Sequence, residues 1–187
     1  MLLDVRLFTV KEYQQMAESG ILNPEERVEL LAGQILKMAA KETAHSAATT
    51  RTEKLLENRL GNQALVRVQE PVQLDDFSEP EPDIAVVRFD PLYYEDHHPN
   101  PSEIYLIIEV ADTTLSKDCG IKARIYAQSG IADYWVLDVN NRQLHVFREP
   151  SENGYQSELI LSDSRRVSPL AFPEFTIAVG EMLRPLA

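Results

Sequence analysis

The apolar positions of this chain fall into runs whose spacing predicts a mixture of strands and helices. Largely apolar runs at residues 84–87, 104–110 and 132–139 are typical of strands buried on both faces of a sheet. Between the last two runs, residues 115–128 have helical spacing and precede Ser129-Gly130, a typical helix end. The pattern therefore predicts a sheet with residues 104–110 as a central strand, followed by a helix and a further strand.

The rest of the chain predicts two more helices and several hairpins. Thr9 and Glu12 form a capping-box pattern at the start of a helix that ends near Ser19-Gly20, and a second helix covers residues 43–60 before Gly61. Further strands are expected at residues 64–69 and 72–74. Hairpin turns are predicted at Ala32-Gly33 between residues 27–31 and 34–38, at Asn140-Asn141 before residues 143–147, and at Asn153-Gly154 before residues 158–161.

Length and composition indicate one globular domain spanning residues 1–187. No apolar run approaches the roughly 20 residues of a membrane-spanning helix. Residues 1–6 lack a basic region followed by an apolar segment, so we expect no secretory signal and a cytoplasmic location. The single cysteine, Cys119, excludes an internal disulfide and an all-cysteine metal site.

The charge balance disfavours tight, indiscriminate binding to nucleic acid. The net charge is −12, with 30 acidic and 18 basic residues, and an acidic surface repels phosphate backbones without excluding a local basic groove. Around residues 43–60, basic side chains alternate with acidic ones, which is typical of a solvated face rather than a DNA-binding stripe. These residues are Lys41, Arg51, Lys54 and Arg59 with Glu42, Glu53 and Glu57.

Two carboxylates mark the candidate chemistry. Glu109 ends the apolar run 104–110, and burying it unpaired would cost several kcal/mol, so it needs a metal, a cation or water beside it. Asp83 begins the run 84–87, behind an extended segment that is stiffened by prolines. With the backbone carbonyl of Val110, these oxygens would suit Mg²⁺, or Mn²⁺ as an alternative. Such an ion lowers the pKa of a bound water and neutralises charge on a phosphate.

Lys122 is the candidate cation for this site. On the helix expected at residues 115–128, Ile121 and Ile125 should face the core, and Lys122 lies about 60° from Ile125, at the border of the buried stripe. Asp118, one turn earlier, is placed to contact the lysine. The ammonium would orient a water or stabilise charge in the transition state.

His45 and Glu29 have open assignments. His45 lies in the first turn of the helix 43–60, where the helix dipole favours a neutral imidazole that could bind a substrate or metal, or serve a surface or capping role. Glu29 lies in a hairpin arm, where alternation favours a position facing solvent. The pair His97-His98 is not expected to hold a metal, since adjacent residues in a loop seldom ligate one ion.

Taken in order, these segments resemble the Uma-two family of restriction-endonuclease-like proteins, within the PD-(D/E)XK nuclease superfamily. The resemblance covers most of the chain and is strongest in Glu81-Pro82-Asp83-Ile84-Ala85-Val86-Val87. The other matching segments are Val28-Glu29-Leu30-Leu31-Ala32-Gly33-Gln34-Ile35, His45, Val66-Arg67-Val68-Gln69, Leu106-Ile107-Ile108-Glu109-Val110, Asp118, Lys122, Tyr126, Gly130 and Asp133-Tyr134-Trp135-Val136-Leu137-Asp138.

This resemblance implies an α/β (α+β) fold with a central mixed sheet, flanking helices and additional β-hairpins, and metal ligation by Asp83 and Glu109. The superfamily lysine normally follows the acid by two residues, where this chain has Ala111. The resemblance assigns that role to Lys122 on the following helix. It also implies supporting roles for Glu29, as an acid from the N-terminal region, and for His45, Gln69 and Asp118.

The leading functional hypothesis is a Mg²⁺-dependent phosphodiesterase that cleaves nucleic acid, with DNA the expected substrate, through attack of a metal-activated water. A homodimer is expected, because two copies present two sites to two strands. One alternative is a non-catalytic binding or assembly module that retains the nuclease fold. A second is a purely structural salt-bridge network of Asp83, Glu109 and Lys122.

Overall fold

The computed structural model describes residues 5–23 and 25–186. The expected absence of a secretory signal concerns residues 1–6, of which residues 1–4 lie outside the described ones, so that expectation stays a prediction. The elements are α1 (Val10–Glu18), β1 (Val28–Leu31), β2 (Gln34–Lys37), α2 (Thr43–Leu60), β3 (Leu65–Val68), β4 (Ile84–Val87), β5 (Ile104–Ala111), α3 (Leu115–Lys117), α4 (Ala123–Gln128), β6 (Asp133–Asp138), β7 (Gln143–Ser151), β8 (Gly154–Ser162), β9 (Arg166–Val167), β10 (Ile177–Ala178) and α5 (Val179–Met182). Short 3₁₀ turns cover Gly61–Gln63 and Pro101–Glu103, and a π-helical turn, Asp118–Lys122, joins α3 to α4.

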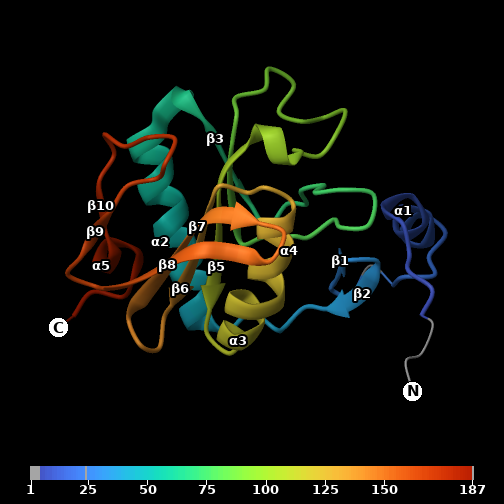
Figure 1. The fold of residues 1–187 in the computed structure, drawn as a ribbon, viewed down its shortest axis with the longest axis horizontal. Helices are drawn as coiled ribbons and strands as arrows, with labels where there is room; N and C mark the ends of the chain where they lie inside the picture. The colour runs from blue at the N-terminus through green and yellow to red at the C-terminus, as the bar shows by residue number, and fades with distance from the viewer. Residues whose placement is uncertain (1–4, 24, 187) are drawn as a thin grey trace.

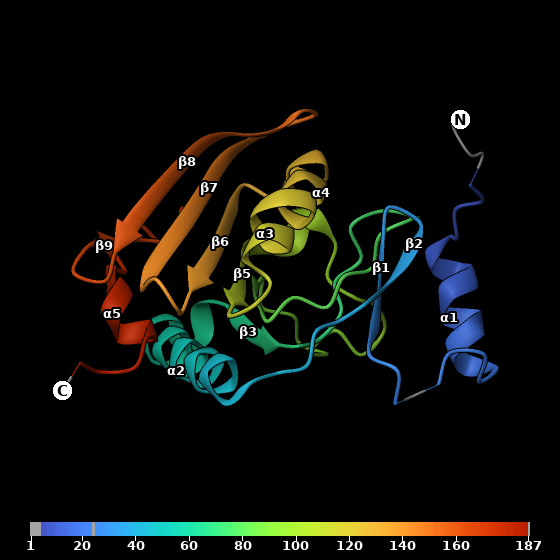
Figure 2. The same ribbon diagram turned by 90° about the horizontal axis from the view of Figure 1, so that it is seen from below.

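A six-stranded mixed sheet forms the centre of the fold. Its strand order is β3-β4-β5-β6-β7-β8. β5 and β6 are parallel and are joined by the crossover through α3 and α4, whereas the other neighbouring strands are antiparallel. Figures 1 and 2 show α2 and α5 on one face of the sheet and α3 and α4 on the other, with α1 and the β1–β2 hairpin at one end. The predicted mixed sheet with flanking helices and added hairpins is confirmed.

Alternation along the strands decides which side each residue faces. Ile108 packs in the core cluster that contains the buried residues of α2, whereas Ile107 packs with Tyr126 of α4 in a second cluster. Because strand side chains alternate between faces, Glu109 lies on the same face as Ile107, beneath α4. The same alternation places Asp83, directly before Ile84, on that face.

Local signals located the helix ends and turns correctly. Thr9 caps α1 through its side chain, and the Glu12 side chain accepts a hydrogen bond from the Thr9 N–H at 3.0 Å, which completes the predicted capping box. α2 covers the predicted residues and ends at Leu60, before Gly61, whose φ of 53° suits glycine. The hairpins predicted at residues 32–33, 140–141 and 153–154 are confirmed, although β7 and β8 extend further than expected.

The helix after β5 differs from the prediction at its centre. The prediction that both isoleucines face the core is wrong for Ile121, which is 47% exposed, and right for Ile125, which is buried. The cause is the π-helical turn Asp118–Lys122, whose i→i+5 hydrogen bonding changes the helical phase within the segment. As a result, Lys122 is only 4% exposed instead of lying at the border of the buried stripe.

The strand predicted at residues 72–74 is not formed. Val72 and Leu74 are buried, and their N–H groups donate to the carbonyls of Pro80 and Ser78. The opposing segment contains Pro80 and Pro82, which lack the N–H groups that a complete ladder requires. Proline therefore limits this pairing to isolated hydrogen bonds and leaves the segment before Asp83 irregular.

Within residues 5–23 and 25–186, no helix combines the length and apolar character that crossing a membrane requires.

Candidate functional site

A narrow cleft lies between the β1–β2 hairpin and the central sheet. Its walls come from the linker between β2 and α2, the first turn of α2, the segment before β4, the end of β5 and the π-helical turn. Its volume of about 50 Å³ has room for a few water molecules. Most of the predicted site residues line it, namely Asp83, Glu109, Lys122, Glu29, His45 and Asp118, whereas Gln69 and Val110 contact Asp83 from outside the lining.

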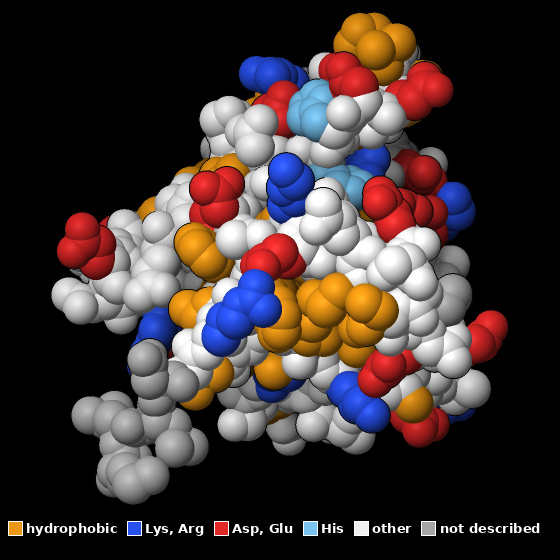
Figure 3. All heavy atoms as spheres, turned by 90° about the vertical axis from the view of Figure 1, so that its right-hand side faces the viewer, with side chains coloured by type: hydrophobic (Ala, Val, Ile, Leu, Met, Phe, Trp, Pro, Cys, Tyr) orange, Lys and Arg blue, Asp and Glu red, His pale blue; other side chains and the backbone are white. Residues whose placement is uncertain are grey.

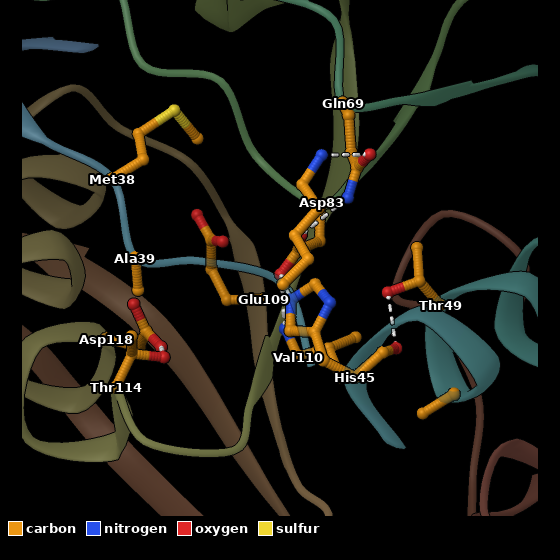
Figure 4. Close-up of polar contacts among 12 residues, drawn as sticks. Met38, Ala39, His45, Thr49, Gln69, Asp83, Glu109, Val110, Thr114 and Asp118 are labelled. Atoms are coloured by element: carbon orange, nitrogen blue, oxygen red, sulfur yellow. Dashed lines mark hydrogen bonds and ion pairs between the residues drawn. The ribbon is translucent and has the colours of Figure 1, made fainter. Parts of the chain in front are cut away.

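Asp83 is held by hydrogen bonds from three elements, as Figure 4 shows. Its Oδ2 atom lies 3.0 Å from Nε2 of His45 and accepts the N–H of Val110 at 2.9 Å. Its Oδ1 atom accepts from the Gln69 amide at 3.3 Å. Burial alone would raise the pKa of Asp83, but the hydrogen bond and charge of His45, with the other donors, lower it below the ordinary value. Asp83 is therefore an ionised, fixed carboxylate, and His45 contacts it directly.

Gln69 links Asp83 to Lys41. It follows the last residue of β3 with a φ of 55°, an uncommon conformation for a residue other than glycine. Its N–H donates to the Asp83 carbonyl at 3.1 Å, and its side-chain oxygen accepts a hydrogen bond from Lys41. Uncommon backbone conformations of this kind concentrate at functional sites. Gln69 therefore contacts both Asp83 and Lys41, and its supporting role stays a prediction.

Glu109 lies deeper, in a buried cluster with Lys122 and Tyr126. Its Oε1 atom accepts hydrogen bonds from Lys122 Nζ and Tyr126 Oη, each at 2.9 Å. Among the described residues, no donor hydrogen-bonds to Oε2. Burial raises the pKa of Glu109 to about 8; Lys122 opposes this shift, and Asp83, Asp118 and Glu29 add to it. The site therefore holds a carboxylate that an additional cation would stabilise.

Glu29 does not face solvent, contrary to the alternation-based prediction. It is 1% exposed, and its carboxylate lies 2.8 Å from Lys117 Nζ and 3.2 Å from Lys122 Nζ. The hairpin packs its Glu29 face against the crossover helix, where two lysines offset the cost of burial. Glu29, the N-terminal acid that the family resemblance implies, therefore lines the cleft, where it pairs with Lys117 of α3 and Lys122 of the π-helical turn.

The predicted contact between Asp118 and Lys122 is not an ion pair within the part of the chain that the structure describes. Asp118 instead accepts a hydrogen bond from the Thr114 hydroxyl, and Lys122 pairs with Glu109 and Glu29. Burial alone would lower the pKa of Lys122, but Glu109, Glu29 and Asp118 raise it well above the ordinary value. The π-helical turn rotates the lysine toward the sheet, and the ammonium is protonated at neutral pH.

A family comparison matches residues 10–180 of the chain to the Uma2 family, described as "Putative restriction endonuclease". The chain belongs to the Uma2 family. This result confirms the resemblance inferred from the ordered motifs and places the chain in a nuclease-like family. A comparison with curated proteins found no match.

Among solved structures, the fold is similar to a protein from Anabaena variabilis described as "a putative nuclease belonging to DUF820". The TM-score is 0.71 at 17% sequence identity, and the similarity covers 94% of this chain and 97% of the other. At this identity the match establishes the shared fold. The Uma2 match and the shared fold together show a restriction-endonuclease-like protein.

The sequence did not predict two contacts of this site. Tyr126 lies one turn after Lys122, and this spacing could have indicated a shared contact with Glu109. Lys117 lies five residues before Lys122, which an α-helix would place on a different face. The π-helical turn brings residues at this spacing together, so that both lysines reach Glu29.

Proposed function

We propose that this Uma2 protein is a Mg²⁺-dependent phosphodiesterase that hydrolyses nucleic acid in the cleft between Asp83 and Glu109. One observation carries the proposal: two carboxylates from neighbouring strands line the same cleft, and a buried lysine pairs with the second of them. Asp83 and Lys122 do not form an ion pair among the described residues, which argues against a closed salt-bridge network of all three residues.

The donor set fits a hard divalent ion. Among the described residues, no group of three or more His, Cys, Asp or Glu side chains is arranged to hold a metal. Mg²⁺ typically takes only one or two carboxylates and completes its shell with water and substrate phosphate. Asp83 and Glu109 would supply those carboxylates. Val110 would add its carbonyl, because its N–H points to Asp83 and the two backbone groups of a strand residue point to the same side.

When bound, the metal would supply an activated water and positive charge for the phosphate. Lys122 is protonated and fixed between two acids, so it acts as a hydrogen-bond donor and not as a general base. Its ammonium would stabilise negative charge that develops on a phosphate oxygen in the cleft. Glu29 and Tyr126 fix the position of this group through Lys122 and Glu109.

His45 and Gln69 orient Asp83. His45 Nδ1 is buried and has no hydrogen-bond partner among residues 5–23 and 25–186. The imidazole ring is therefore held by the hydrogen bond between its Nε2 atom and Asp83. These two side chains leave Asp83 one defined orientation toward the cleft. A ligand that must be held within a few tenths of an ångström benefits from such support.

A paired binding and cleavage experiment tests the proposal. We expect Mg²⁺ and Mn²⁺ to bind the wild-type protein in calorimetric titrations, and plasmid DNA to be cleaved by the same samples. Glu109→Gln should lose both, because the amide removes the negative charge while retaining the shape. Metal binding without cleavage of DNA or RNA would favour the non-catalytic module, and no metal binding would contradict the proposed site.

Metal affinity should increase with pH. Ligation by Glu109 requires the ionised form, and its pKa is raised to about 8, so protons compete with the metal below that pH. We expect Mg²⁺ affinity to be about 30-fold lower at pH 6.5 than at pH 9. The metal-free protein should show the opposite trend in stability: its unfolding free energy falls as pH rises from 4.5 to about 8, because the folded state binds this proton more tightly. Equal metal affinities at the two pH values would contradict this role of Glu109.

We further propose that the substrate is DNA. We also propose that the chain forms one domain, is located in the cytoplasm and acts as a homodimer. The edge strand β8 supports the homodimer, because Leu159 and Ile160 are 55% and 51% exposed on it. Apolar side chains on an open sheet edge favour pairing with a second chain. Sedimentation equilibrium measures the association state directly.

A further inference from the structure

We infer that a groove along α2, continuous with the cleft and bordered by basic and hydroxyl side chains, binds the phosphate backbone of a nucleic-acid duplex. The groove consists of two hollows. The first is lined by Lys41, Thr43, Ser46, Ala47, Thr50 and Arg51. The second shares Thr43, Ala47 and Arg51 with it and extends to Asn140, Arg142 and Arg184, with Ala44, Ala48, Val139 and Leu183 as its apolar floor. Lys41 also lines the catalytic cleft, so the three depressions form one path. This inference rests on the proposed nuclease function.

Charge is the first argument for this occupant. The chain carries a net charge of −12, yet the linings of the two hollows contain no Asp or Glu. Four cations lie along them, namely Lys41, Arg51, Arg142 and Arg184. Arg142 pairs with Asp163 at 3.1 Å, whereas Arg51 and Arg184 form no ion pair within the described part of the chain. A local concentration of cations on an acidic protein matches a phosphate backbone.

The spacing of the groove residues on α2 is the second argument. Thr43, Ser46 and Thr50 recur at three- or four-residue intervals, as do Thr43, Ala47 and Arg51, so these residues share one broad helix face. Leu56 and Leu60 of the same helix are buried against the sheet. From Thr43 to Arg51 the face is about 12 Å long, which corresponds to three or four nucleotides of one strand.

The tertiary structure thus separates charges that are mixed in the sequence. Lys54 pairs with Glu57 at 2.8 Å and Arg59 pairs with Glu181 at 3.4 Å, away from the groove linings. Figures 1 and 2 place α5 and the C-terminal segment beside α2, which brings Arg184 to the groove. In contrast, Lys and Arg are interspersed with Asp and Glu on the face in Figure 3.

The absence of aromatic side chains from these two linings favours a duplex over a single strand. Proteins that bind single strands stack bases on aromatic rings, and neither hollow is lined by Phe, Tyr, Trp or His. Hydroxyls and cations instead contact phosphates and position a duplex without reading its sequence. The groove would therefore direct a duplex into the cleft and add affinity that is independent of sequence.

The test measures binding without cleavage. A short fluorescein-labelled DNA duplex is titrated in EDTA with the wild-type protein, with the double variant Arg51→Gln/Arg184→Gln, and with the control Lys11→Gln/Arg124→Gln. The control removes the same charge from the exposed surfaces of α1 and α4. Fluorescence anisotropy over a range of KCl concentrations gives the affinity and its salt dependence.

We expect the groove variant to bind at least about 10-fold more weakly at low salt, with a salt slope reduced by about 2, because each lost phosphate contact lowers the slope by about 1. The control should bind like the wild-type protein. Arg184→Gln alone, at an exposed position, should lower the slope by about 1, and Arg51→Lys should retain most of the affinity.

Equal losses in the groove and control variants, an unchanged groove variant, or preferential binding of a single strand would overturn the inference. A wild-type protein that does not bind the duplex would also overturn it. The measurement requires neither metal nor cleavage. Loss of Mg²⁺-dependent cleavage with intact groove binding would therefore contradict the proposed chemistry alone.

Discussion

Asp83→Asn is expected to abolish metal-dependent cleavage of DNA while the protein stays folded. The amide keeps the shape of the carboxylate and an oxygen that can accept the Val110 N–H, but it loses the charge that would hold the metal. We expect the cleavage rate to fall at least about 10³-fold, which corresponds to about 4 kcal/mol of transition-state stabilisation. Single-turnover cleavage of a plasmid with excess protein measures this rate without a contribution from product release.

Glu81→Gln is the matched control for this variant. Glu81 lines the same cleft two residues earlier, and its carboxylate pairs with Arg27 at 3.3 Å instead of with the Asp83 donors. Cleavage should stay within a few-fold of the wild-type rate. Urea unfolding of both variants separates a lost metal ligand from a lost fold. Wild-type cleavage by folded Asp83→Asn protein would show that Asp83 does not hold the catalytic metal.

Lys122→Met should cause the largest loss of stability in the chain's polar core. The ammonium lies 2.9 Å from Glu109 and 3.2 Å from Glu29, and all three side chains are nearly inaccessible to solvent. Its removal leaves two acids buried without their shared cation, which costs about 3–5 kcal/mol. Because Glu109 can take up a proton, the loss in unfolding free energy should be smaller near pH 6 than near pH 8. Urea unfolding at the two pH values measures both effects.

Two further variants distinguish a catalytic role of Lys122 from a purely structural one. Lys117→Met removes the partly exposed partner of Glu29 and should cost only about 1 kcal/mol. Lys122→Met/Glu109→Gln removes both charges of the shorter pair and should recover a large part of the stability lost by Lys122→Met, without recovering cleavage. If Lys122→Met cleaves DNA at the wild-type rate at a temperature where it is folded, the lysine is a structural residue, as in the salt-bridge alternative.

Local signals in the sequence predicted most of the elements and several of their ends. The capping box at Thr9, the glycine after α2 and the turn residues of the hairpins act over three or four residues, so they can be read without knowledge of the fold. The buried runs around Asp83 and Glu109 likewise showed that two carboxylates begin or end core strands. The strand predicted at residues 72–74 is not formed, because its pairing depends on the facing segment at residues 78–80, where Pro80 has no N–H to complete a ladder.

By itself, the sequence determined the order of the elements and the candidate acids, because these depend on periodicity and on short-range backbone chemistry. Only the tertiary structure decided the surroundings of those acids. The π-helical turn buries Lys122 and exposes Ile121, and the hairpin brings Glu29 to two lysines 88 and 93 residues away along the chain. Such contacts depend on helical phase and on the packing of distant segments, and neither is encoded in the spacing of neighbouring residues.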